Sequence, residues 1–208
     1  ERLNILVPPV PTIKAKTRKA MEMYGLRLVF LPKELTEKDY PMDFVKPNWG
    51  RCLTVDGIER RPLPGRWVLV ETIQKSNWKD PKGYGNGNDP LAKDLGLPSR
   101  FSISWDDLHM THLPSAAKLL GLSKKAVRLT TAEEWQWIAY AFLWLNRHRN
   151  MTLPNFGSTN SWEWCENAYR GDDRLVMGDR GRGGLGGVGG CWHGDTDDGI
   201  GFRVLAVL

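Results

Sequence analysis

The chain has 208 residues, of which 41% are hydrophobic and 25% are charged, and these values exclude a disordered, collagen-like or disulfide-dependent chain. Its net charge of +5 comes from residues 1–150, with 24 Lys/Arg against 16 Asp/Glu, whereas residues 151–208 carry five Arg, no Lys and eight Asp/Glu. Because a nucleic-acid binder concentrates basic residues beside its recognition element, the acidic C-terminal part argues against nucleic acid as the partner.

Neither a signal peptide nor a membrane-spanning segment is visible in the sequence. The first four residues do not form the charged-then-apolar layout of a signal peptide. No apolar run reaches the roughly 18 residues that a spanning helix needs, so we expect a soluble chain without a membrane span. Cys52, Cys165 and Cys191 are too few and too widely spaced for a disulfide framework, which favours a reducing compartment.

The first half of the chain contains one clear helix and two clear strands. Residues 14–24 predict a helix, because Gly25 follows where a left-handed residue commonly ends one. Residues 26–31 and 66–73 are bounded by turn-forming residues and predict strands. The stretch over residues 78–98 is rich in glycine, asparagine and proline and predicts a long surface loop.

A long helix is predicted to begin near residue 131. Thr130 with Glu133, or Thr131 with Glu134, fits the capping box that satisfies the free amides at a helix start, and the sequence leaves both open. Apolar and aromatic residues then occupy all sides of the helix, and Gln136 is the only clearly polar residue until residue 146. This composition predicts a helix that is buried nearly all round, with its three tryptophans in the core.

The C-terminal part alternates short strands with turn-rich sequence. Residues 162–165 form an aromatic segment, residues 174–177 predict a strand, and residues 202–208 predict the final strand. Residues 178–201 hold 11 of the 22 glycines and have neither helical nor alternating periodicity, which predicts irregular loops. Since neither an internal repeat nor a second core is evident, residues 1–208 are predicted to form a single domain.

Three short motifs suggest chemistry, and each has an ordinary structural explanation. Residues 181–186 match a dinucleotide-binding glycine pattern, but further glycines follow where that site requires a helix. The acidic stretch over residues 195–199 offers oxygen ligands but lacks the glutamate of a calcium loop. His109 and His112, ahead of a short helix predicted over residues 113–122, have no complete metal-ligand set nearby.

Four motifs of the second half, in this order, resemble one known fold family. They are RLTTAEEWQW (128–137), SWEWC (161–165), RLVMG (174–178) and GFRVL (201–205). Together they resemble the C-type lectin fold of the formylglycine-generating-enzyme type, over about residues 128–208. The resemblance implies an α+β fold in which two helices pack on a mixed, mostly antiparallel sheet and long irregular loops complete the domain.

The enzymes of this family hold copper with a cysteine pair that is close in sequence near the end of the domain. This chain has only Cys191 there, and Cys165 lies 26 residues earlier in the sequence. The close spacing of the family's cysteine pair is therefore absent. Cys191 and His193 also lack a third group that would orient a catalytic thiol. We therefore expect a protein that is not an enzyme, with a copper oxidase or a calcium-dependent lectin as the alternatives.

The chain is also similar to the variable proteins of diversity-generating retroelements, a phage and prokaryotic group. Their C-type lectin fold carries a hypervariable C-terminal stretch that arises by mutation of adenines, often in asparagine codons. Here residues 171–208 contain no Asn and no Lys. Of residues 178–199, only Trp192 is a type that cannot arise from an asparagine codon by changing adenines.

This resemblance implies a receptor-recognition protein, on a cell surface or virion, with a variable ligand-binding region at about residues 171–201. We expect a protein or glycan ligand, a monomer or small homo-oligomer, and neither a cofactor nor a metal. Trp192 is expected to be a packed anchor beneath the binding surface. The residues expected to form that surface are Asp179, Gly181, Arg182, Gly189, Gly190, Cys191, His193, Gly194, Asp195, Asp197 and Asp198.

Overall fold

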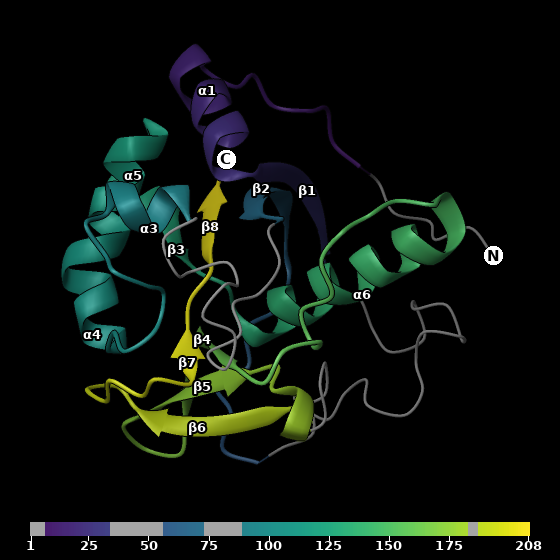
Figure 1. Ribbon diagram of the computed structural model, residues 1–208. Coiled ribbons are helices and arrows are strands. Elements are labelled where there is room, and N and C mark those ends of the chain that lie inside the picture. The colour runs from purple at the N-terminus through teal and green to yellow at the C-terminus, as the bar shows by residue number, and fades with distance from the viewer. Residues whose placement is uncertain (1–6, 34–55, 73–88, 183–186) are drawn as a thin grey trace.

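The computed structural model describes residues 7–33, 56–72, 89–182 and 187–208, which form two four-stranded sheets and several helices (Figure 1). The first sheet is antiparallel throughout, in the order β1 (Leu26–Lys33), β2 (Pro64–Glu71), β8 (Val204–Val207), β3 (Val127–Leu129). The second is mixed, because β4 and β7 are parallel, in the order β6 (Val188–Trp192), β5 (Asp173–Met177), β4 (Trp162–Tyr169), β7 (Ile200–Gly201). The predicted α+β class is therefore confirmed, but the single sheet is wrong.

Helices cover both faces of the first sheet. Alternate side chains of a strand point to opposite faces, and accordingly Leu69 of β2 packs with α1 (Ala15–Tyr24) and α5 (Leu113–Leu120), whereas Val68 and Val70 pack with α6 (Ala132–Arg149). Figure 1 shows α1 and α5 on one side, α6 on the other, and the second sheet with β6 at its outer edge. Short α3 (Pro90–Asp94), α4 (Trp105–Asp107) and a π-helical turn (Leu108–His112) precede α5, and 3-10 turns occupy Lys124–Ala126 and Arg180–Arg182. None of the described helices is long and apolar enough to cross a membrane.

The helix α6 begins with a capping box formed by Thr131 and Glu134, which decides between the two pairs that the sequence allows. Most of its first half is buried, including Gln136, as far as Phe142. Of the three tryptophans expected in the core, Trp135 is buried, whereas Trp137 and Trp144 are half-buried. Residues 143–146 are half-buried and the last turn is exposed, so the expectation of burial all round is wrong for the second half.

Two further predictions need correction, and one is confirmed. The loop predicted over residues 78–98 contains the helix α3, which begins after Asp89. The Asp89 side chain caps this helix, because it accepts a hydrogen bond from the Ala92 amide at 3.0 Å. Residues 78–88 of the predicted loop lie outside the described residues. The final strand predicted over residues 202–208 is confirmed as β8, which the chain enters directly after β7 of the other sheet. The irregular stretch over residues 178–201 contains β6, paired with β5.

Buried ion pairs fix the place where the chain changes sheets. Arg203 donates to Glu163 of β4 at 2.8 Å and to the Glu71 carbonyl of β2 at 2.7 Å, and Glu163 accepts from the Trp135 indole at 2.6 Å. Arg100 donates to both carboxylate oxygens of Glu71, at 2.6 and 2.7 Å. All four charged side chains are 3% exposed or less. Such groups are stable in the interior only when each is paired, so they hold the two sheets in one relative position.

Candidate functional site

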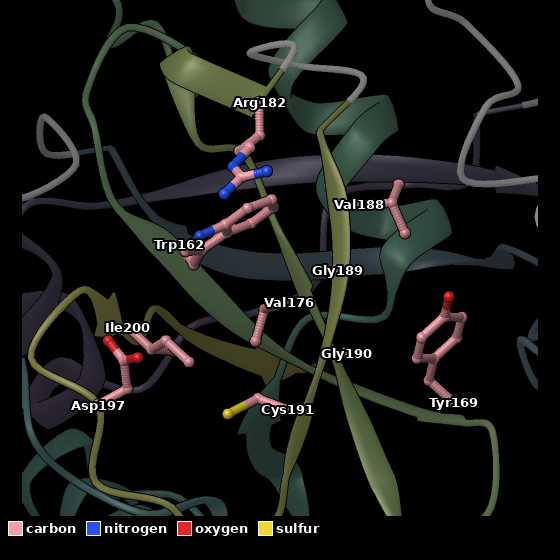
Figure 2. A pocket seen from close by; sticks show the side chains of 10 residues that line it. All are labelled: Trp162, Tyr169, Val176, Arg182, Val188, Gly189, Gly190, Cys191, Asp197 and Ile200. Carbon is pink, nitrogen blue, oxygen red and sulfur yellow. The ribbon is translucent and has the colours of Figure 1, made fainter.

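One hollow among the described residues lies against β6, the edge strand of the second sheet. It measures about 560 Å³, and Figure 2 shows the side chains around it. The Arg182 guanidinium lies beside the Trp162 ring at one end, and Cys191 and Asp197 lie toward the other. The wall consists of Trp162, Tyr169, Val176, Arg182, Val188, Gly189, Gly190, Cys191, Asp197 and Ile200.

The structure brings the residues predicted for the binding surface to this one side of the molecule. Five of them, Arg182, Gly189, Gly190, Cys191 and Asp197, line the hollow. The others lie beside it in the segments that enter and leave β6. The six that lie beside the hollow are Asp179, Gly181, His193, Gly194, Asp195 and Asp198. None of the eleven predicted surface residues is buried.

The sequence did not identify the apolar half of the hollow. Trp162 and Val176 belong to β4 and β5, and they reach the hollow because strand pairing places Val176 opposite Gly189. Tyr169 lies at the far end of β4 and packs against Gly190. The only sequence signal for these residues was the aromatic segment itself, since neighbours across a sheet depend on register rather than on spacing along the chain.

The polar residues near the hollow are held in fixed contacts. The Cys191 thiol donates to Asp195 at 3.3 Å. Burial, this hydrogen bond and the nearby carboxylates of Asp195, Asp197 and Asp173 raise the pKa of Cys191 to about 12. His193 Nδ1 lies 2.5 Å from an Asp106 carboxylate oxygen of α4, and Asp197 accepts from the Gly199 amide at 2.6 Å. The thiol is therefore kept protonated, and the loop after β6 is tied to α4.

The glycines of the site differ in the room they leave. A Cβ at Gly190 would lie 2.2 Å from Cδ1 of Tyr169, and a Cβ at Gly194 would lie 2.4 Å from Cζ3 of Trp192. At Gly189 the nearest atom would be Cγ2 of Val176 at 3.3 Å. These three glycines have no positive φ, so substitution there is limited by space rather than by the backbone.

Trp192 is not the packed anchor that was predicted. Its side chain is 52% exposed, because it lies at the end of the edge strand with its ring over Gly194. The buried anchors of the second sheet are Trp164, 1% exposed, and Trp135 of α6, fully buried. Trp192 therefore belongs to the surface of the site.

The two described cysteines cannot meet at one metal. Cys165 is fully buried in the core beneath α6, whereas Cys191 packs against the other core. Cys191 lies opposite Arg174 in the β5–β6 register, so its side chain is on the same face of the sheet as Val176 and Trp164. Cys165 follows Trp164 in β4, so its side chain is on the opposite face. Neither of these two cysteines forms a disulfide within the described residues, and Cys52 lies outside them.

The histidines of the π-helical turn have structural contacts. His109 Nδ1 lies 2.8 Å from the Trp105 carbonyl oxygen, and its Nε2 lies 3.1 Å from Glu166. Burial lowers the pKa of His112, more than Asp107 raises it. In the described part of the chain, no group of three or more His, Cys, Asp or Glu side chains is placed to hold a metal ion. Residues 183–186 of the glycine pattern lie outside that part.

No family model and no curated protein matches the sequence. Among solved structures the chain is similar to Treponema denticola variable protein 1, with a TM-score of 0.49 and 11% sequence identity. The match covers 88% of this chain and 95% of that one.

Proposed function

We propose that this chain is a ligand-binding protein with a C-type lectin fold, whose surface over about residues 171–201 is diversified by a retroelement. One observation carries the proposal: exposure changes abruptly at the end of this region. Residues 195–198 are all exposed, whereas residues 200–206 are all buried. Apart from the glycine at position 201, the exposed fraction of the buried residues is between 0% and 4%. Side chains on one side of this boundary can change at little cost to stability, and those on the other side cannot.

The buried ion pairs support this division of roles. Arg203 follows the exposed loop directly and is fixed by Glu163 and by the Glu71 carbonyl. The loop therefore ends at a rigid position whatever its own side chains are. A rigid scaffold that carries variable loops is the general design of recognition surfaces.

Binding is favoured over catalysis by the state of the one thiol at the hollow. A nucleophilic or metal-binding cysteine works as the thiolate. The Cys191 thiol donates a hydrogen bond to Asp195 and has a raised pKa, so it stays protonated, which opposes both roles. We propose a protein or glycan as the ligand, held by polar contacts and by the exposed ring of Trp192.

The DNA around the gene tests the proposal. We expect a near-copy of the codons for residues 171–208 that differs only where the copy has adenine, beside a reverse transcriptase gene. A folding test is independent of genomic context: randomising the codons for Asp195, Asp197 and Asp198 together should leave most variants folded. The same treatment of Phe202, Arg203 and Val204 should leave few. Equal tolerance of the two sets, or the absence of the near-copy, would contradict diversification.

A further inference from the structure

The strand β6 differs from the other edge strands of the two sheets. Natural proteins protect an edge strand by shortness, by proline or by charged side chains. Among the described edges, β1 contains Pro32 and Lys33, β3 has three residues, and β7 has two. β6 has five residues, Val-Gly-Gly-Cys-Trp, without charge or proline, and no described strand pairs with its outer side.

The hollow lies beside this edge and has an uneven charge. Trp162, Val176 and Ile200 form an apolar wall, since Gly189 leaves the space in front of Trp162 free of a side chain. Asp197 lines one end, and the carboxylates of Asp195 and Asp173 act on Cys191 there. Arg182 lies at the other end. A side chain with an aliphatic stem and a positive end fits the apolar wall and the acidic end together.

We propose that the ligand is a protein segment that adds to β6 as a further strand and places a lysine or arginine side chain in the hollow, its charge at Asp195 and Asp197. This inference rests on the proposed function and names its ligand class. Strand addition supplies affinity through main-chain hydrogen bonds and specificity through alternate side chains. The glycines of β6 permit close approach of the second backbone, and the variable loops around them select the segment.

The test uses seven-residue peptides, blocked at both ends, that alternate threonine and valine around a central lysine or glutamate. Binding to the full chain is followed by amide NMR. We expect the lysine peptide to shift the amide signals of residues 188–192 and the indole signal of Trp162, and to slow hydrogen exchange at alternate amides of β6. Affinity in the range of about 1 mM to 1 μM is expected for such a short strand. The glutamate peptide should bind about tenfold more weakly, the effect of one charge-assisted contact.

Variants and a modified peptide separate the alternatives. Asp195→Asn with Asp197→Asn should remove the preference for lysine, whereas Glu22→Gln on α1, an exposed carboxylate outside the site, should leave it unchanged. A lysine peptide methylated on the amide nitrogens that face β6 should lose binding, and one methylated on the opposite edge should keep it.

The proposal is overturned if the lysine peptide causes no shift at about 5 mM, a concentration above the expected dissociation constants, or if lysine and glutamate bind equally. It is also overturned if sedimentation shows a dimer that peptide dissociates, since a second copy would then occupy the edge. These failures leave the codon near-copy untouched, so they are distinguishable from failure of diversification.

Discussion

Gly190 is the position where diversification and packing conflict most directly, and Gly190→Ala measures the conflict. The new methyl group would lie 2.2 Å from Cδ1 and 2.6 Å from Cε1 of Tyr169, so the ring must move. Overpacking of this kind costs about 1–3 kcal/mol, and replacing a strand glycine with alanine returns about 0.5–1 kcal/mol. The net loss is then about 0–2.5 kcal/mol, or a fall in Tm of up to roughly 10 °C for a chain of this size.

Gly194→Ala provides the matched comparison. Its methyl group would also lie against an aromatic ring, with Cζ3 and Cη2 of Trp192 at 2.4 and 2.5 Å. Trp192 is 52% exposed and these atoms are at the far end of its ring, so the ring can swing into solvent. We expect a change of no more than about 0.5 kcal/mol, as for surface substitutions generally.

Urea unfolding followed by circular dichroism measures both variants, alone and with Tyr169→Ala. In the Tyr169→Ala background, Gly190→Ala should become neutral or stabilising by about 0.5 kcal/mol. The clash with the ring is then removed, and the only effect left is the smaller loss of backbone entropy when alanine replaces glycine. Equal stability of the two alanine variants would refute the reasoning. So would a Gly190→Ala loss that Tyr169→Ala does not relieve, since the crowding would then not be its cause.

Replacing Arg203 with Met removes the ion-pair partner of the buried Glu163 and should cost about 3–5 kcal/mol in urea unfolding, and adding Glu163→Gln should recover part of the loss. Thr131→Ala should cost about 1 kcal/mol in the same assay through loss of the helix cap, whereas Thr130→Val should be neutral or stabilising because the Thr130 hydroxyl has no hydrogen-bond partner among the described residues. The Cys191 thiol, with its pKa raised from 9.0 to about 12, should be alkylated slowly at pH 8, which peptide mapping by mass spectrometry measures. The folded state binds this proton more tightly than the unfolded chain does. The contribution of Cys191 to stability is therefore complete below pH 9 and falls as the pH rises toward 12.

The local elements of this fold could be predicted from the sequence because local signals determine them. Gly25 ends α1 in the left-handed conformation, as its position predicts, and Thr131 caps α6. The strands β1, β2 and β5 lie within two residues or so of the predicted ranges. α3 was missed because its five residues are too short for a periodic pattern, although the Asp-Pro pair at its start was a usable signal.

The division into two sheets could not be predicted in the same way. It depends on Arg203, whose partners Glu163 and Glu71 are 40 and 132 residues away in sequence. The wall of the hollow was missed for a related reason, since it requires the register between β5 and β6. Trp192 was predicted to be a packed anchor beneath the surface, but its place at the end of an edge strand leaves half of it in solvent.

The buried charges also explain how a variable segment and a fixed strand can adjoin. An apolar contact would hold β8 about equally well in energy, but it would not distinguish one register from the next. A slip of one residue would turn every side chain of a strand to the opposite face. We infer that Arg203 prevents such a slip, since its guanidinium reaches Glu163 and the Glu71 carbonyl from one position only. The Arg203→Met variant tests this inference: faster exchange of the β8 amides than of the β2 amides supports it, and equal exchange contradicts it.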